Sequence, residues 1–497
     1  MLDTLGDRSE LACLTSPVPD VAPNVLLLVM DAARRDALTP YGAPASATPA
    51  IAELARRGHA IPLAYATGSW TLPSHASMFT GLLPGRLGLG QPPAGHPASA
   101  RPRLERFEQR LLPRVLGRAG YRCEGFSANL WASQEPGFDI GFDAFTYSAS
   151  ERVARNDTLL GGGARARLAW ALEGARARTD DGAAALGRSL RSSIARWSGQ
   201  PTFWFVNLVE CHSPYLPPRP WNDLGPRDRI GAALDSQRHL NFASICLHGA
   251  GHGHVPEESM QRMRHLYGRA ISYMDAWLAD VLGALRERGI LDDTLVIVTS
   301  DHGESFGEHG LLAHGFSLGE HLIHVPVVMA GPGARDSESA VSLAKLPAWI
   351  AQAAGIDSHP YLETDLPAEA VIAQYEPMCG PEDPRAQSFA RMWNLDAEAV
   401  RKLTTGLSCA TDGRHKLVVD DTGRESLYDL LADPDERSPA PAPADGPAAS
   451  LRAVLDQAAI EEARLEPAPE PTAAPASAAS ADELAALERQ LKLLGYM

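Results

Sequence analysis

Short runs of apolar residues alternate with segments of helical spacing along most of the chain. The runs have the length of buried strands and lie at Val25–Met30, Arg122–Ser127, Thr202–Val209, Leu295–Thr299 and Val325–Met329. Between two of them, Tyr267–Arg288 has apolar residues three and four positions apart and predicts a long helix. Strands that alternate with helices favour an α/β core with a central, mainly parallel sheet between helices.

The same pattern divides the chain into five parts. These are an irregular tail over residues 1–22, a main domain over 23–367, a smaller α+β subdomain over 368–437, a Pro- and Ala-rich linker over 438–480 and a terminal helix over 481–497. Residues 150–200 are rich in Ala and Arg and predict insert helices at the periphery of the main domain. The terminal helix carries a leucine stripe, which would either dock on the same chain or pair two copies in a homodimer.

The net charge and the cysteines limit which partners and which cellular compartment are expected. A formal net charge of −16 without a basic stripe argues against nucleic acid, whereas a small anionic metabolite is compatible with it where a metal ion makes the pocket locally positive. The first twenty residues contain no apolar segment, and no apolar run of about 18 residues occurs elsewhere, so neither a signal peptide nor a membrane span is expected. Six cysteines without CxxC spacing predict free thiols, and together these features predict a cytoplasmic protein.

Candidate chemistry lies at the ends of the predicted strands. Asp31 ends the first strand, and Asp301 and His302 follow the fourth strand after Ser300. Thr71 precedes Pro73 at the start of a short predicted helix, whose free N–H groups would face an incoming anion. Strand ends of an α/β sheet open onto the binding crevice, so these side chains are expected to meet there. Their oxygen and imidazole ligands suit one divalent cation, which would lower the pKa of the threonine hydroxyl.

Other interpretations of these residues stay open. Thr71 could serve as an N-cap, Asp31 could cap a following helix, and His302 could be structural. The ligand set also bears on the metal, because Ala32 offers no second carboxylate and His302 supplies nitrogen. This disfavours Ca²⁺, which takes six to eight oxygen ligands, and favours Mn²⁺, Zn²⁺ or Mg²⁺.

Several motifs follow one another in an order that carries a resemblance. They are Pro23-Asn24-Val25, Thr71-Leu72-Pro73-Ser74-His75, Glu210-Cys211-His212, Asp301-His302-Gly303-Glu304, His314-Gly315, Gly331-Pro332-Gly333 and Leu427-Tyr428-Asp429-Leu430. On these motifs the chain resembles the sulfatase family of the alkaline phosphatase superfamily over residues 22–437. The resemblance implies an alkaline-phosphatase-like catalytic domain over residues 23–367 that carries out metal-dependent ester chemistry.

The resemblance also assigns roles to two histidines. His212 and His314 lie where the family keeps groups that bind the transferred oxyanion or protonate the leaving group. Leu208 stands where two-metal relatives carry a ligand, so one divalent ion is expected rather than two. This chain has His75 where the family usually has Arg, and Ala32 where members often have a second Asp.

The largest departure from the family is Thr71. Sulfatases usually have Cys or Ser here, oxidised to formylglycine, but threonine is a secondary alcohol and cannot give that aldehyde. At this position the chain resembles the phosphodiesterases and phosphotransferases of the superfamily. The expected function is therefore hydrolysis or transfer of a phosphate or phosphonate ester of a soluble metabolite, with Thr71 as nucleophile. Two alternatives are a sulfuric ester hydrolase that works without formylglycine and a catalytically silent relative that binds an anionic metabolite.

Overall fold

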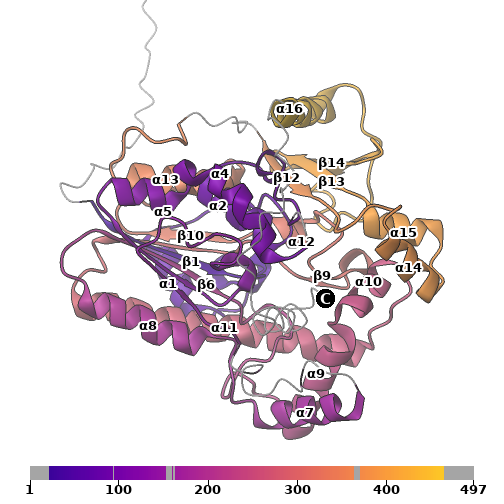
Figure 1. Ribbon diagram of the computed structural model, residues 1–497, viewed down its shortest axis with the longest axis horizontal. Coiled ribbons are helices and arrows are strands. Elements are labelled where there is room, and N and C mark those ends of the chain that lie inside the picture. Colours follow the sequence, from indigo (N-terminus) through magenta and orange to yellow (C-terminus); the bar gives the residue numbers. More distant parts are fainter. Residues whose placement is uncertain are drawn as a thin grey trace, which may run out of the picture.

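A twisted central sheet organises the protein (Figure 1). The computed structural model describes residues 22–92, 95–150, 152, 159, 163–362 and 370–463. The sheet has the strand order β2-β10-β7-β1-β6-β4-β5. Its strands are β1 (Asn24–Met30), β2 (His59–Ala60), β4 (Arg122–Ser127), β5 (Ala144–Tyr147), β6 (Thr202–Leu208), β7 (Thr294–Thr299) and β10 (Val327–Ala330). Neighbours from β7 to β5 run parallel, and β10 runs antiparallel to β7 and to β2. The predicted α/β core with a mainly parallel sheet is confirmed.

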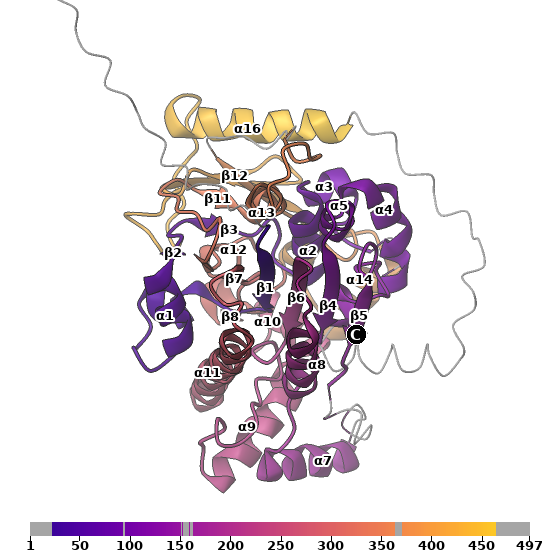
Figure 2. The ribbon, with the colours of Figure 1, turned by 90° about the vertical axis from the view of Figure 1, so that its left-hand side faces the viewer.

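Helices cover both faces of this sheet, which is why its central strands β1, β6 and β7 are buried throughout and mainly apolar. Along β1, Leu26, Leu28 and Met30 contact one layer, while Val25 and Leu27 contact the other. The first layer contains α1 (Pro49–Arg57), α8 (Ala183–Arg196) and α11 (Glu257–Arg288). The second contains α2 (Thr71–Thr80), α5 (Leu112–Arg118) and α13 (Leu346–Ala353), and Figure 2 shows the sheet between the two layers.

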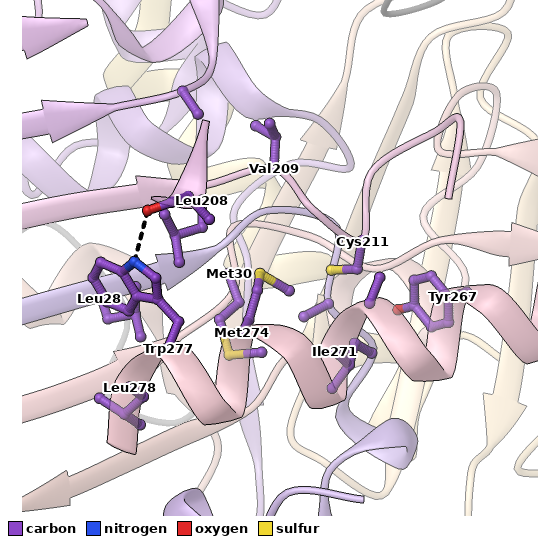
Figure 3. Close-up of a cluster of buried hydrophobic side chains, with 14 of the residues drawn as sticks. Leu28, Met30, Leu208, Val209, Cys211, Tyr267, Ile271, Met274, Trp277 and Leu278 are labelled. Carbon is purple, nitrogen blue, oxygen red and sulfur yellow. Dashed lines mark hydrogen bonds between the residues drawn. The ribbon is translucent and has the colours of Figure 1, made fainter. Parts of the chain in front are cut away.

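The long helix α11 begins ten residues before its predicted start at Tyr267 and ends at the predicted Arg288. Figure 3 shows Tyr267, Ile271 and Met274 among the side chains that α11 directs towards the ends of β1 and β6. The early turns were hidden by their many charged residues, although Met260 and Met263 already follow the helical spacing and are buried.

The insert helices differ from the prediction for residues 150–200. Whereas α7 (Gly163–Arg176) packs against α9 (Pro226–His239) away from the sheet, α8 is part of the core and not peripheral. Its Leu186, Leu190 and Ile194 are buried, and Trp277 Nε1 of α11 donates to Ala183 O at 2.8 Å. Alanines and arginines around these apolar residues masked a stripe with helical spacing.

The C-terminal subdomain is an antiparallel sheet with helices beside it. Its strands are β12 (Val371–Tyr375), β13 (Leu407–Thr411), β14 (His415–Asp420) and β15 (Glu425–Asp429), and α14 (Pro384–Trp393) and α15 (Ala397–Thr404) lie between β12 and β13 in the chain. Helix α16 (Gly446–Ala463) covers this sheet, as Figure 2 shows at the top. The linker predicted over residues 438–480 is thus wrong in its first half, because Pro447 is tolerated in a first helical turn and Leu451 is buried. The terminal helix predicted over 481–497, and the tail over 1–22 apart from Ala22, lie outside the described residues.

The described residues also form shorter strands and α-helices. They are β3 (Ala64–Tyr65), β8 (Ser305–Phe306), β9 (Leu312–Ala313), β11 (Val341–Ser342), α3 (Pro84–Leu87), α4 (Arg101–Arg106), α10 (Phe242–Gly249) and α12 (Glu320–Ile323). None of the helices in the described ranges is long and apolar enough to cross a membrane. Five cysteines fall within the described residues and all are free thiols, as predicted.

A buried lysine joins the C-terminal sheet to the core. Lys416 of β14 is fully buried, and its Nζ donates to Leu318 O at 2.5 Å and to Glu320 Oε1 of α12 at 3.0 Å. Glu436 Oε1 lies 2.8 Å from the same Nζ. Although burial alone would raise the pKa of Glu320, the Lys416 ammonium lowers this pKa to about 2.

We expect Lys416→Met to destabilise the protein by about 3–5 kcal/mol, because it leaves two buried carboxylates without a counter-charge. The measurement is the free energy of unfolding in urea. Since the folded-state pKa of Glu320 is depressed, its contribution is present above about pH 5 and is lost as pH falls towards 2. In the variant this loss should disappear or reverse, because without the Lys416 ammonium burial raises the pKa of Glu320 and protonation then favours the folded state. Lys402→Met is the control, because Lys402 pairs with Glu398 on the surface and its loss should cost less than about 1 kcal/mol.

Candidate functional site

Three side chains from two neighbouring strand ends meet at the carboxyl edge of the central sheet. Asp31 follows β1, where its N–H donates to Leu208 O at 2.8 Å. Asp301 and His302 follow β7, the strand that pairs with β1 in parallel register. All three side chains are fully buried. The sequence prediction that strand ends bring them together is thus met by the geometry.

These residues direct three atoms towards one another. His302 Nε2 lies 3.7 Å from Asp31 Oδ1 and 3.5 Å from Asp301 Oδ2. None of the three atoms has a hydrogen-bond partner among the described residues, although each is buried. His302 Nδ1 lies 2.8 Å from Gly303 O, which can only accept, so Nδ1 carries the proton and Nε2 presents a lone pair to the carboxylates. Two carboxylate oxygens and one imidazole nitrogen that lack hydrogen-bond partners among the described residues fit a divalent cation.

Burial shifts the pKa of each group in the direction that favours its uncharged form. It raises the pKa of Asp301 to about 7, and it raises the pKa of Asp31, to which the neighbouring Asp301 charge adds. It lowers the pKa of His302 to about 3, assisted by His314. A divalent cation would favour the ionised carboxylates instead, and it would bind the neutral imidazole that burial already favours.

Thr71 lies beside this cluster as the first residue of α2. Its Oγ1 is 3.5 Å from Asp31 Oδ2. Asn129 Nδ2 donates to Thr71 Oγ1 at 3.1 Å and to Asp31 Oδ2 at 2.7 Å. The N-cap of α2 is Trp70, and the partners of the Thr71 hydroxyl are side chains, not backbone N–H groups of its own helix. The alternative that Thr71 acts only as an N-cap is therefore not what the structure shows.

His75 fills the position where the family usually has Arg. Its Nε2 lies 3.2 Å from Asn207 Nδ2, which can only donate, so Nδ1 carries the proton. Nδ1 faces Thr71 O at 3.0 Å and Asp301 Oδ2 at 3.4 Å. Burial lowers the pKa of His75 to about 4, so its ring is neutral at physiological pH. It links the first turn of α2 to the carboxylate cluster.

The two other predicted histidines lie against the same cluster. The ring centroids of His212 and His314 are 4.8 Å apart, and those of His302 and His314 are 4.4 Å apart. His314 Nδ1 is 3.1 Å from Glu304 Oε1. Burial lowers the pKa of His314 well below its usual range, with His212 adding to the shift, and it raises the pKa of Glu304.

Four residues of this site were not among the predicted site residues. Asn129, Asn207, Glu304 and His75 each contact a predicted residue. Asn207 could have been found, because it is a polar residue near the carboxyl end of a mainly apolar strand. Asn129 follows the end of β4, but no motif marks it in the sequence.

Taken together, the chain is an α/β protein with a mainly parallel sheet, and a carboxylate–imidazole cluster and a hydroxyl lie at the carboxyl edge of that sheet as a candidate metal site. The family model described as "Sulfatase" matches residues 23–356. The chain belongs to the sulfatase family.

The chain is similar to sulfatases and to phosphonate monoester hydrolases. It is 26% identical over 338 residues to the choline-sulfatase of Rhizobium meliloti (strain 1021), which covers 63% of each chain, less than two thirds of that relative's length. Its fold matches the phosphonate monoester hydrolase of Agrobacterium radiobacter with a TM-score of 0.59 and 21% identity, covering 89% of this chain and 95% of that one. It also matches a 2-O GAG sulfatase with a TM-score of 0.60 and 15% identity, covering 89% and 93%.

Proposed function

We propose that this protein is a metal-dependent hydrolase or transferase that uses Thr71 as nucleophile on a phosphate or phosphonate ester. One observation carries the proposal. The Thr71 hydroxyl lies at a helix N-terminus, accepts from the Asn129 amide and faces the carboxylate cluster through Asp31. A hydroxyl in this place has no capping role, and it cannot become formylglycine, so direct attack is the chemistry left to it.

The chain's own residues supply most of the reaction. Oγ1 of Thr71 passes its proton to Asp31 Oδ2, the acceptor that it faces at 3.5 Å, and forms the new bond to phosphorus while the bond to the leaving oxygen breaks. Asn129 Nδ2 stabilises the negative charge on Oγ1, and the N–H groups at the start of α2 face the phosphoryl oxygens. His212 or His314 protonates the leaving oxygen, and Glu304 holds the His314 ring in place through Nδ1. An anionic substrate favours the protonated form of His314, which is neutral in its absence.

One divalent ion would be held by Asp31, Asp301, His302 and Thr71, and it would supply Lewis-acid stabilisation of the nucleophile and of the transferred group. We infer Mn²⁺, Zn²⁺ or Mg²⁺ rather than Ca²⁺, because the set contains an imidazole and two carboxylates. The substrate we infer is a small anionic metabolite of the cytoplasm. The free thiols support a reducing compartment, and the net charge of −16 disfavours nucleic acid. A homodimer through residues 481–497 remains a prediction.

Sulfuric ester hydrolysis without formylglycine is the second candidate, and the similarity to choline-sulfatase favours it. A panel of 4-nitrophenyl phosphate, phosphodiester, phosphonate and sulfate, each with added Mn²⁺, Zn²⁺, Mg²⁺ or Ca²⁺, separates the candidates. We expect kcat/KM for one phosphorus ester to exceed that for the sulfate by at least about tenfold, or about 1.4 kcal/mol. A preference for the sulfate would contradict the proposal, and absence of turnover on all esters would indicate a silent binding protein.

A further inference from the structure

A cavity of about 640 Å³ opens beside the candidate site. Trp70, Ser213 and His314 line its inner end, so it adjoins both the residue before Thr71 and the residue after His212. Its outer walls come from α10, from β9 and the loop that follows it, and from α14 and α15 of the C-terminal subdomain, which lie together on one side of the molecule (Figure 1). A volume of this order holds a ligand of the size of a drug molecule. If Thr71 attacks phosphorus, the leaving group is the part of the substrate that this cavity can receive.

The walls of this cavity are mainly apolar and aromatic. They include Phe242 and Ile245 from α10, Phe316 and Tyr375 near the junction of core and subdomain, and Phe389, Leu395, Val400 and Leu403 from α14 to α15. Burial raises the pKa of the Cys246 thiol to about 12, and the Cys379 thiol adds to this shift, so Cys246 is an uncharged, soft contact. Trp70 Nε1 already donates to Gly90 O at 3.0 Å. This surface favours an apolar ligand.

Charge is nearly absent from the same surface. Apart from His314, Arg385 is the only charged or titratable nitrogen side chain among the described residues that line the cavity, and no carboxylate is among them. The Arg385 guanidinium is engaged by Asp383, with Nη2 to Oδ2 at 2.8 Å and Nε to Oδ1 at 3.0 Å. The cavity therefore offers neither a carboxylate for a cationic group nor a cluster of cations for a polyanionic sugar.

We propose that this cavity binds the leaving group of the substrate and selects a neutral, bulky, aromatic alcohol. This inference rests on the proposed function, because it takes the cavity as the leaving-group side of Thr71. Phe389 is the wall residue that tests it best, since no residue of α14 is buried and its loss should leave the fold intact. Met392 on the same helix is exposed and lies outside the cavity lining, so Met392→Ala is the matched control.

The first experiment compares phenyl and 2-naphthyl esters of whichever acid the panel identifies, because their leaving phenols are of similar acidity. We expect kcat/KM to be about tenfold higher for the naphthyl ester, since the second ring buries further apolar surface. Phe389→Ala should reduce this ratio several-fold, mainly through KM, whereas Met392→Ala should keep it. A ratio near one in the wild-type protein would overturn the inference while leaving Thr71 chemistry intact.

The second experiment tests charge at constant shape. The choline ester and the 3,3-dimethylbutyl ester have nearly the same shape, and only the first carries a positive charge. We expect the neutral ester to have the lower KM. A lower KM for the choline ester would overturn the inference, because the aromatic walls would then bind the cation through cation–π interactions.

A third measurement does not depend on turnover. Calorimetric titration of 2-naphthol into the Thr71→Ala variant should show one site, which Phe389→Ala weakens at least fivefold and Met392→Ala does not. Binding of 2-naphthol without turnover of any ester would reject the proposed function but support the cavity as an aromatic site. Turnover of esters without 2-naphthol binding would support the proposed function but reject the cavity as an aromatic site.

Discussion

Replacing Thr71 by alanine should lower kcat by about four to six orders of magnitude, as removal of a covalent nucleophile does in other enzymes. The fold should survive, because Thr71 Oγ1 forms its hydrogen bonds with the side chains of Asn129 and Asp31 and takes no part in the backbone bonds of α2. Thr71→Ser should keep part of the rate, since a hydroxyl remains at the same place. The measurement is steady-state turnover of the best ester of the 4-nitrophenyl panel under metal saturation.

A second threonine of the same helix provides the control. Thr80 is also buried on α2, but it lies at the far end, where its Oγ1 donates to Ala76 O at 2.7 Å. Thr80→Ala removes the same atoms and should change stability by about 1 kcal/mol while leaving turnover near wild type. If Thr71→Ala retained near-full turnover, the nucleophile would be water, and this result would favour the alternative of sulfuric ester hydrolysis without formylglycine.

The covalent product itself can be trapped. With a 4-nitrophenyl leaving group, the first step needs no proton donor, so a His314→Ala variant should still form the ester on Thr71. Breakdown of that ester by water needs general-base help, and loss of the His314 imidazole should slow it. Mass spectrometry of the peptide that carries Thr71 should then show one added phosphoryl group. If 4-nitrophenol is released in a burst but the Thr71 peptide carries no added phosphoryl group, the result would contradict covalent catalysis.

The fold could be predicted where burial dictates the sequence. The central strands β1, β6 and β7 are covered on both faces, so every position is buried, most positions are apolar, and the strands are visible as apolar runs. Helices α8 and α16 were harder, because alanine-rich and charged segments hide a narrow apolar stripe, and their burial depends on tertiary contacts that local sequence does not contain.

The residues of the site also fall into two groups, those that could be predicted from the sequence and those that depend on tertiary contacts. Asp31, Asp301 and His302 could be predicted because they follow apolar strands at one sheet edge. Asn129 reaches Thr71 from a separate strand end, 58 residues away in the chain, and only the parallel pairing of β4 with β6 brings it there. The cavity walls come from α10, α14 and α15, and their meeting depends on how the subdomain docks on the core.

Removal of the metal should abolish activity, and so should removal of its ligands. We expect Asp301→Asn and His302→Ala to lose the bound ion and to lower kcat/KM by about 10³-fold, because the charge stabilisation from a metal is worth several kcal/mol and each 1.4 kcal/mol is tenfold. Elemental analysis should find one divalent ion per wild-type chain. Asp275→Asn is the control, because Asp275 is a buried carboxylate that accepts from Ala50 N and Ile51 N at the start of α1 and is not among the residues of the cluster. It should keep the ion.

The affinity for this ion should rise with pH, and the sign follows from the pKa shifts of the metal-free site. Burial raises the pKa of Asp301 to about 7, so near pH 6 the Asp301 carboxyl group holds a proton that a cation must displace, and burial shifts the pKa of Asp31 in the same direction. Below the pKa of Asp301 the apparent affinity should therefore increase by about tenfold per pH unit, and binding should release protons into the buffer. Calorimetric titration of Mn²⁺ or Zn²⁺ into chelator-treated protein at pH 6, 7 and 8, in buffers of different ionisation enthalpy, measures both quantities. Full activity in chelator, or an affinity that does not change over this range, would contradict a metal bound by Asp31, Asp301 and His302, because carboxylates this deeply buried bind a cation only by giving up their protons.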